Sequence, residues 1–267
     1  MEVVIFVVAL VVGVLGSMLG IGGGVLLIPL LTGFFGVPIK TAIGASIVSV
    51  IATSSAAGAV YVGRGLSHTR LAMVLEIATT LGALAGGITA VLLGPNLLEG
   101  LFALVLVYVV YSLRRLPTEE HTAAPTGVLD TSYTDPASGA TVSYGVRSLP
   151  VGMGASFLAG NVSGLLGIGG GIIKVPIMSL VMGMPLRAAI ATSNFMIGVT
   201  AATSAVIYYQ RGLLDPNVAI PTALGVLVGA QIGTRIGGKV RSNRLKRIFQ
   251  GLLLIFAVQM LYQAVMG

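Results

Sequence analysis

The sequence predicts an all-α polytopic membrane protein with two inverted-topology repeats of about five helical segments each. Three observations support this prediction: too little charge for a soluble surface, two long apolar blocks, and one Gly-rich motif that occurs in both blocks. Of the 267 residues, 55% are hydrophobic and only 9% are charged, whereas soluble domains usually carry roughly 25% charged residues. A water-soluble globular domain is therefore excluded.

The acidic residues divide the chain into three parts. Half of the eight Asp and Glu residues lie in one central stretch, namely Glu119, Glu120, Asp130 and Asp135. The flanking blocks are almost free of acid, and each is long enough for four to five spans at about 20 residues per transmembrane helix. We therefore predict a first transmembrane repeat over 1–115, a linker over 116–147 and a second transmembrane repeat over 148–267.

The two blocks repeat one another in sequence. A shift of 147 positions places the Leu-Gly-Ile-Gly-Gly-Gly of 19–24 on the identical residues of 166–171. The same shift pairs Pro29 with Pro176, Pro38 with Pro185, Ser46 with Ser193, Thr53 with Thr200 and Tyr61 with Tyr208. Apolar composition alone does not produce a shared Gly-rich block with prolines in register. The chain is therefore an internal duplication.

Each repeat contains five apolar segments. They cover about 3–19, 24–36, 41–62, 70–93 and 97–114, and then about 148–166, 171–183, 188–209, 217–237 and 246–265. The second segment of each repeat is short, since a helix of about 13 residues rises ~20 Å against a hydrocarbon core of ~30 Å. Each short segment follows the Gly-rich turn, so we predict a broken or re-entrant hairpin in each repeat. Such backbone is stable at membrane depth only if protein buries it or it lines a wet cavity.

The basic residues predict the orientation, because cytoplasmic loops of membrane proteins collect Lys and Arg. Basic residues gather in the 62–70 connection, at both ends of the linker and in the 235–247 connection. This pattern predicts a multi-pass protein of the inner (plasma) membrane with linker 116–147 in the cytoplasm and both termini outside. With five elements per repeat, the two repeats then have opposite orientations. If each hairpin were one continuous span, the repeats would be parallel and the 235–247 connection would face outward.

The linker contains the one soluble-looking stretch of the sequence. Residues 132–144 alternate in polarity and carry turn residues at their middle, which is typical of a β-hairpin. A disordered tether between the repeats is the alternative. Neither structure is a catalytic domain.

Several functional classes lack the residues that they need. The chain has no cysteine, and its two histidines, His68 and His121, are too few for a histidine metal cluster. Val175 follows Lys174 where a P-loop requires Ser or Thr, so no motif supports nucleotide binding. The net charge of +7 is explained by topology rather than by nucleic acid. We therefore predict no enzyme, no cofactor and no metal.

The two Gly-rich turns are the strongest local signal of a binding site. Gly22, Gly23 and Gly24 in the first turn, and Gly169, Gly170 and Gly171 in the second, each precede a short helix. Exposed backbone N–H groups at a helix N-terminus bind anions, and inverted-repeat transporters bind substrate near the bilayer midplane. Alternatively, the glycines only permit tight turns and close helix contact.

Two ionisable residues lie within the apolar segments. Lys174 is one turn into the second short segment, where a lysine is costly unless it faces water, an anion or a carboxylate. It is a candidate for substrate binding, and the alternative is a shallow lysine that snorkels to the interface. Glu76 lies about two turns into its segment. It is a candidate for carrying a coupling proton, and the alternative is a pair with Arg70.

Neutral polar residues add further candidates for substrate contact. They are Thr192, Ser193, Asn194 and Asn161 near the second Gly turn and Ser46 in the first repeat. Hydroxyl and amide groups suit an oxyanion that must also be released. For each residue the alternative is an interhelical hydrogen bond, worth about 1 kcal/mol or less.

The doubled Gly-Ile-Gly-Gly-Gly turn, Pro29 and Pro176 downstream of it, and the 191–194 stretch resemble the TauE/SafE family of sulfite and organosulfonate exporters. The resemblance covers both apolar blocks. It implies a secondary transporter of small sulfur-containing or related organic anions, working by alternating access and coupled to an ion gradient. An anion channel is the alternative function, since re-entrant hairpins also build filters. The expected partners are a small anion and the lipid bilayer, with a homodimer left open.

Overall fold

The computed structural model describes residues 2–115, 129–135, 139–237 and 243–266. The first half contains α1 (Glu2–Leu19), α2 (Gly24–Phe35), α3 (Ile39–Gly63), α4 (Thr69–Leu92) and α5 (Pro95–Arg115). The second half contains α6 (Leu149–Leu166), α7 (Gly171–Pro176) with a π-helix (Ile177–Val181), α8 (Leu186–Gln210), α9 (Pro216–Gly237) and α10 (Asn243–Met266). The linker residues 116–128, with Glu119, Glu120 and His121, and residues 238–242 of the basic connection lie outside the described residues.

The all-α polytopic fold class is confirmed. Within the described residues, eight helices are long and apolar enough to cross a membrane, and the helices at 24–35 and 171–181 are shorter. These bounds follow the predicted segments to within a few residues. Large apolar side chains are exposed on the outer helix faces, for example Val3, Met73, Leu104, Ile255 and Tyr262. An apolar exterior of this kind is suited to lipid rather than to water.

The two short helices begin in the same way, directly after the Gly-rich turn, but differ after their prolines. Pro29 lies inside α2, which remains α-helical to Phe35. Its equivalent, Pro176, ends α7, and the chain then widens into the π-helix Ile177–Val181. Proline lacks a backbone N–H and disrupts the regular hydrogen-bond ladder, and π-helical turns are one local accommodation of such a disruption. The duplicated sequence therefore folds into two related but unequal hairpins.

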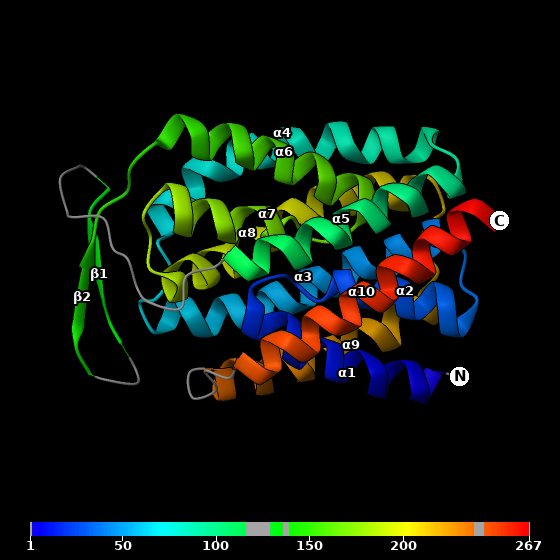
Figure 1. The fold of residues 1–267 in the computed structure, drawn as a ribbon, viewed down its shortest axis with the longest axis horizontal. Helices are drawn as coiled ribbons and strands as arrows, with labels where there is room; N and C mark the ends of the chain where they lie inside the picture. The colour runs from blue at the N-terminus through cyan, green and yellow to red at the C-terminus, as the bar shows by residue number, and fades with distance from the viewer. Residues whose placement is uncertain (1, 116–128, 136–138, 238–242, 267) are drawn as a thin grey trace.

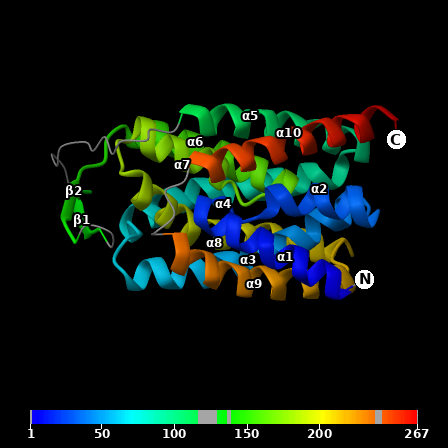
Figure 2. The same ribbon diagram turned by 60° about the horizontal axis from the view of Figure 1, so that its bottom comes forward.

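The main helix contacts join one half of the chain to the other. α1 packs along α9, and α6 packs along α4, which is the equivalent pairing (Figures 1 and 2). The central helices α3 and α8 pack on each other, α3 also packs on α9, and α8 also packs on α4. α5 and α10 pack together beside them. The two halves are thus interleaved rather than side by side.

Glycines permit the closest of these contacts. A Cβ atom on Gly82 of α4 would collide with the backbone carbonyl oxygen of Phe157 in α6. At the equivalent place, a Cβ on Gly229 of α9 would collide with the carbonyl oxygen of Leu10 in α1. Small residues at such positions let helix backbones approach closely in membrane proteins. The α4–α6 and α1–α9 contacts therefore depend on glycine in the same way.

Two strands of the linker form an antiparallel pair at one end of the bundle. β1 (Thr131–Thr134) pairs with β2 (Thr141–Tyr144), with Thr131 opposite Tyr144. The pair is attached to the helices by His68, whose Nε2 lies 2.8 Å from the Leu129 carbonyl oxygen, and by an ion pair between Arg187 and Asp135. The Tyr144 ring also contacts that of His68 edge-on, and burial of the Tyr144 hydroxyl raises its pKa above the ordinary value.

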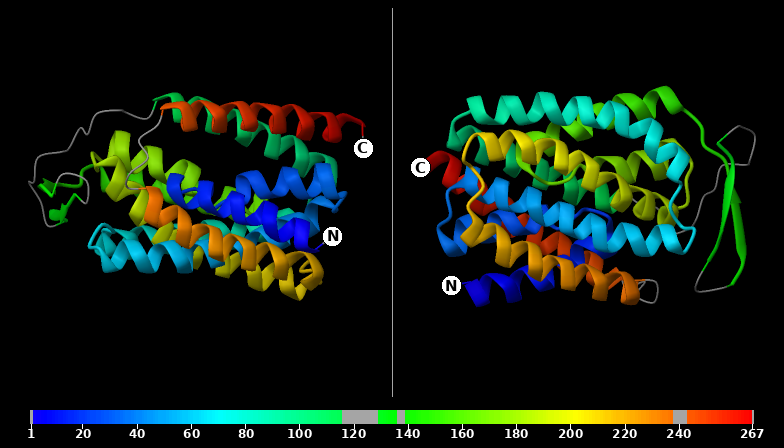
Figure 3. Two further views of the ribbon diagram at one scale, coloured as in Figure 1. Left: turned by 90° about the horizontal axis from the view of Figure 1, so that it is seen from below. Right: turned by 180° about the vertical axis from the view of Figure 1, so that it is seen from behind.

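The ends of the chain lie away from this hairpin. Figures 1 and 3 show both termini at the end of the bundle opposite to β1 and β2. α1 therefore begins at the far end, whereas its equivalent α6 begins beside the hairpin. Equivalent helices of the two halves consequently enter the bundle from opposite ends.

Candidate functional site

The two Gly-rich turns have the same backbone conformation. Gly22 has a φ of 80° and its equivalent Gly169 has a φ of 79°, both in the left-handed region that favours glycine. Gly23 and Gly170 are also left-handed, and each directly precedes the first residue of its helix, α2 or α7. The repeated motif therefore specifies a particular turn, which starts a short helix in each half.

The two turns lie against each other, and a serine from the opposite half of the chain bonds to each of them. Ser46 of α3 donates its hydroxyl to the carbonyl oxygen of Gly167 in the second turn, at 2.8 Å. Its equivalent, Ser193 of α8, donates to the carbonyl oxygen of Gly20 in the first turn, at 3.0 Å. A Cβ on Gly24 would lie only 2.7 Å from the Gly167 carbonyl oxygen. Each half thus holds the Gly turn of the other half.

The remaining neutral candidates have different partners. Asn194 is fully buried and its Nδ2 donates to the Ser17 carbonyl oxygen at 3.3 Å, while its Oδ1 has no hydrogen-bond partner in the described residues. Thr192 accepts a bond from the backbone N–H of His68 near the hairpin end. Asn161 lies on α6 at the contact with Gly86 of α4. Asn194 is therefore close to the Gly turns, whereas Thr192 and Asn161 serve helix contacts.

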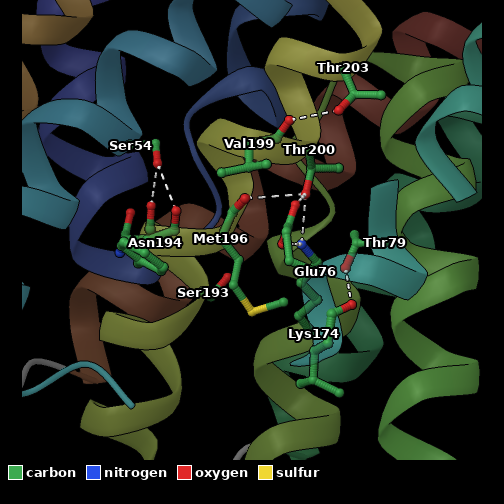
Figure 4. A network of polar contacts seen from close by, with 12 residues as sticks. Ser54, Glu76, Thr79, Lys174, Ser193, Asn194, Met196, Val199, Thr200 and Thr203 are labelled. Atoms are coloured by element: carbon green, nitrogen blue, oxygen red, sulfur yellow. Dashed lines mark hydrogen bonds and ion pairs between the residues drawn. The ribbon is translucent and has the colours of Figure 1, made fainter. Parts of the chain in front are cut away.

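A buried cluster of charged and polar groups brings together Lys174, Glu76 and Thr200 (Figure 4). Lys174 extends from α7 and its Nζ donates to the Thr200 hydroxyl on α8 at 3.0 Å. Thr200 in turn donates to Glu76 Oε1 on α4 at 2.6 Å. Lys174 Nζ lies 3.7 Å from Glu76 Oε2, which completes an ion pair. Three helices therefore converge on one salt bridge.

The cluster is closed to solvent. The side chain of Lys174 is 0% exposed and that of Glu76 is 11% exposed. Removing an ion from water costs several kcal/mol even after relaxation, and a partner of opposite charge offsets much of this cost. Lys174 consequently does not snorkel in this structure, and Glu76 pairs with Lys174 rather than with Arg70. Glu76 Oε2 accepts no hydrogen bond among the described residues. This oxygen can therefore still accept a hydrogen bond.

The equivalent place, formed by positions on α2, α3 and α9, has no charge. The shift of 147 positions places Leu27 at the position of Lys174 and Ala223 at that of Glu76. Thr53, the equivalent of Thr200, donates to the carbonyl oxygens of Ser49 at 2.9 Å and Gly22 at 3.3 Å instead. The two equivalent places therefore share a scaffold, and of the two only the one formed by α4, α7 and α8 carries an ion pair.

The sequence did not single out Thr200 as a functional candidate. Its match with Thr53 in the duplication was a usable signal, because a threonine kept at the same place in both halves faces the same central packing. In the part of the chain that the structure describes, no three His, Asp or Glu side chains gather as metal ligands. The candidate site is therefore a lysine and a carboxylate joined by a hydroxyl.

The fold and this cluster define a multi-pass membrane protein with an ion pair among its central helices. The family model for the sulfite exporter TauE/SafE family matches residues 5–260, so the chain belongs to that family. It is accordingly a membrane transporter rather than an enzyme.

Curated relatives are similar over nearly the whole chain or over part of it. A probable membrane transporter protein YunE of Bacillus subtilis (strain 168) is 26% identical over 98% of this chain and 98% of its own length. A probable membrane transporter protein of Xylella fastidiosa (strain 9a5c) is 27% identical over 95% of this chain and 92% of its own. The sulfite exporter TauE/SafE family protein 5 of Arabidopsis thaliana is 41% identical, over 24% of this chain and 14% of its own. No solved structure matches the chain.

Proposed function

We propose that the chain is a secondary transporter of small sulfur-containing or related organic anions, of the sulfite and sulfonate type. The observation that carries this proposal is the lysine at position 174, buried at the first turn of the short helix α7 and paired with Glu76. An intramembrane lysine is retained at a cost and marks a substrate or ion pathway by default. The family name supports the substrate class.

Substrate contact would come from residues near the two turns. Lys174 supplies the positive charge, and the glycines at 22–24 and 169–171 supply backbone N–H groups at the starts of α2 and α7. Asn194 lies against the first half, and its Oδ1 accepts no hydrogen bond from the described residues. Ser46 and Ser193 hold the turns in place, so their role is to position the site.

Alternating access is the proposed mechanism. Equivalent helices enter the bundle from opposite ends, which supports inverted repeats. In this scheme the repeats rock around the Gly turns, and an ion gradient drives the cycle with Glu76 as the candidate coupling residue. The proposed location is the inner (plasma) membrane, with linker 116–147 in the cytoplasm and both termini outside, as the loop charges favour.

Flux into proteoliposomes tests the proposal. Purified protein is reconstituted and uptake of radiolabelled sulfite and methanesulfonate is followed over a range of concentrations. A transporter gives saturable uptake that a gradient can drive uphill and that excess unlabelled anion inhibits. Unsaturated flux at channel rates would contradict the proposal and favour an anion channel, and absence of flux for both anions would remove the substrate class.

A further inference from the structure

The lysine of the candidate site already has an anion bound to it. Glu76 Oε2 lies 3.7 Å from Lys174 Nζ, and both groups bond to Thr200. Lys174 has three N–H donors, of which Thr200 takes one. A transported anion that uses Lys174 must therefore compete with the carboxylate of Glu76 for the same ammonium group.

We propose that Glu76 is an internal anion that releases Lys174 only when it takes a proton, so that one proton crosses with each monovalent anion. This inference rests on the proposed anion transport and names its coupling ion. Protonation removes the negative charge of the carboxylate, and the anion then takes its place opposite Lys174. Release of the anion and the proton restores the ion pair. No covalent bond is made or broken apart from the O–H bond of the carboxyl group.

The charge of each state explains why the two events are linked. With neither proton nor anion bound, the pair of Lys174 and Glu76 is neutral, and with both bound the site is neutral again. A proton alone leaves one unpaired positive charge, and an anion alone leaves one unpaired negative charge. An unpaired charge at membrane depth is strongly disfavoured. Only the two neutral states can therefore reorient readily.

The other helices packed on Glu76 bring no further charge to the pair. α6 contains no titratable side chain. On α8, Arg187 forms an ion pair with Asp135 near the hairpin, and the Tyr208 hydroxyl donates to the Leu165 carbonyl oxygen. On α4 itself, Arg70 is exposed in the first turn. Within the described residues, the charge state of the site therefore depends on Lys174 and Glu76.

The test measures protons and methanesulfonate together in proteoliposomes. Methanesulfonate is the probe because a sulfonate remains an anion across the usable pH range, so that any co-transported proton is carried by the protein. A dye in the lumen reports pH, and potassium with valinomycin sets the membrane potential. The wild-type protein is expected to move one proton with each methanesulfonate, and the uptake rate is expected not to change with membrane potential.

The Glu76→Gln variant provides a more specific test, because its neutral side chain leaves Lys174 available to an anion at every pH. The loaded site of this variant is neutral, but its empty site carries an unpaired charge. We expect exchange of labelled for unlabelled methanesulfonate to continue with no dependence on pH. Net uptake into empty liposomes should be at least about tenfold slower than in the wild type. The unpaired charge raises the free-energy barrier for reorientation of the empty transporter, and a rise of about 1.4 kcal/mol already slows a step tenfold. Glu99→Gln on α5 is the matched control and should keep coupled net uptake.

The outcomes separate this inference from the proposed function. Saturable wild-type uptake that carries one net charge and no proton would overturn proton coupling and leave anion transport standing. A Glu76→Gln protein that still moves one proton with each methanesulfonate would also overturn it. Because the wild-type ratio of protons to methanesulfonate is decisive by itself, the inference remains testable even if a variant does not fold. Absence of any sulfite or methanesulfonate flux would instead count against the proposed function.

Discussion

Two equivalent sites in this protein are built on the same scaffold and differ in charge, and each site takes residues from both halves of the chain. At the charged site, Glu76 of the first half joins Lys174 and Thr200 of the second half in a buried ion pair bridged by a hydroxyl. At its counterpart, the equivalent positions are Ala223 in the second half and Leu27 and Thr53 in the first, and within the described residues the threonine bonds only to backbone carbonyls. The Gly turns, the serines that hold them and the glycine contacts between helices are the same in both halves. The shared features therefore form the scaffold, and the ion pair that distinguishes the two sites identifies the candidate for anion binding.

The largest effect is expected when the charged site is given the residues of its uncharged counterpart. The double variant Glu76→Ala with Lys174→Leu should fold, because both charges leave together and apolar replacements of a buried ion pair are often neutral or stabilising. Its transport of sulfite and methanesulfonate should fall to the level of empty liposomes. The measurement is proteoliposome flux, with thermal unfolding in detergent as the check on folding. Transport at half the wild-type rate or more would show that the pair is only structural.

Removing the lysine alone should also abolish transport and should cost more stability. Lys174→Met leaves Glu76 buried with no partner charge, and breaking one side of a buried pair costs roughly 3–5 kcal/mol. The free energy of unfolding should therefore be lower than in the double variant, which can be measured by denaturation in mixed detergent. Lys40→Met is the matched control, since Lys40 is half-buried and donates to the Val91 carbonyl oxygen rather than to a carboxylate. If both lysine variants lose the same stability, Glu76 does not depend on Lys174.

The two equivalent threonines should differ in function. Thr200→Val removes the hydroxyl that joins Lys174 to Glu76, and hydrogen bonds to charged groups are worth about 1.5–3 kcal/mol. We expect the transport rate to fall about tenfold or more. Thr53→Val removes bonds to backbone carbonyls only and should leave the rate within about twofold. Equal losses in the two variants, measured as initial uptake rates, would mean that both threonines act through packing.

The smallest effects are expected where the halves are equivalent. Ser46→Ala and Ser193→Ala each remove one hydroxyl bond to the opposite Gly turn. Each should lower the free energy of unfolding by about 0.5–1 kcal/mol, and the two losses should be equal within error. Thermal unfolding of both variants under one detergent condition provides the comparison. A loss confined to one variant would show that the two turns are not held in the same way.

The sequence predicted the fold well because the duplication and the apolar segments are strong signals. Segment limits such as 24–36 and 70–93 differ from those of α2 and α4 by a residue or so, since polar and Gly-rich turns end each segment. Lys174 and Glu76 were identified as candidates because membrane burial makes any charge conspicuous. Their pairing was not predicted, because the sequence does not reveal that α4 and α7 both face α8. The π-helix after Pro176 was missed for a related reason: Pro29 occupies the equivalent position in α2, which stays α-helical.

The central claim is that the ion pair of Lys174 and Glu76 is where the transported anion binds, and equilibrium binding tests it most directly. Radiolabelled methanesulfonate is titrated onto purified protein in detergent, for the wild type and for the Glu76→Ala, Lys174→Leu double variant. The account predicts one saturable site per chain in the wild type, tighter at lower pH, and no saturable binding in the double variant. Unchanged affinity and stoichiometry in the double variant would contradict it.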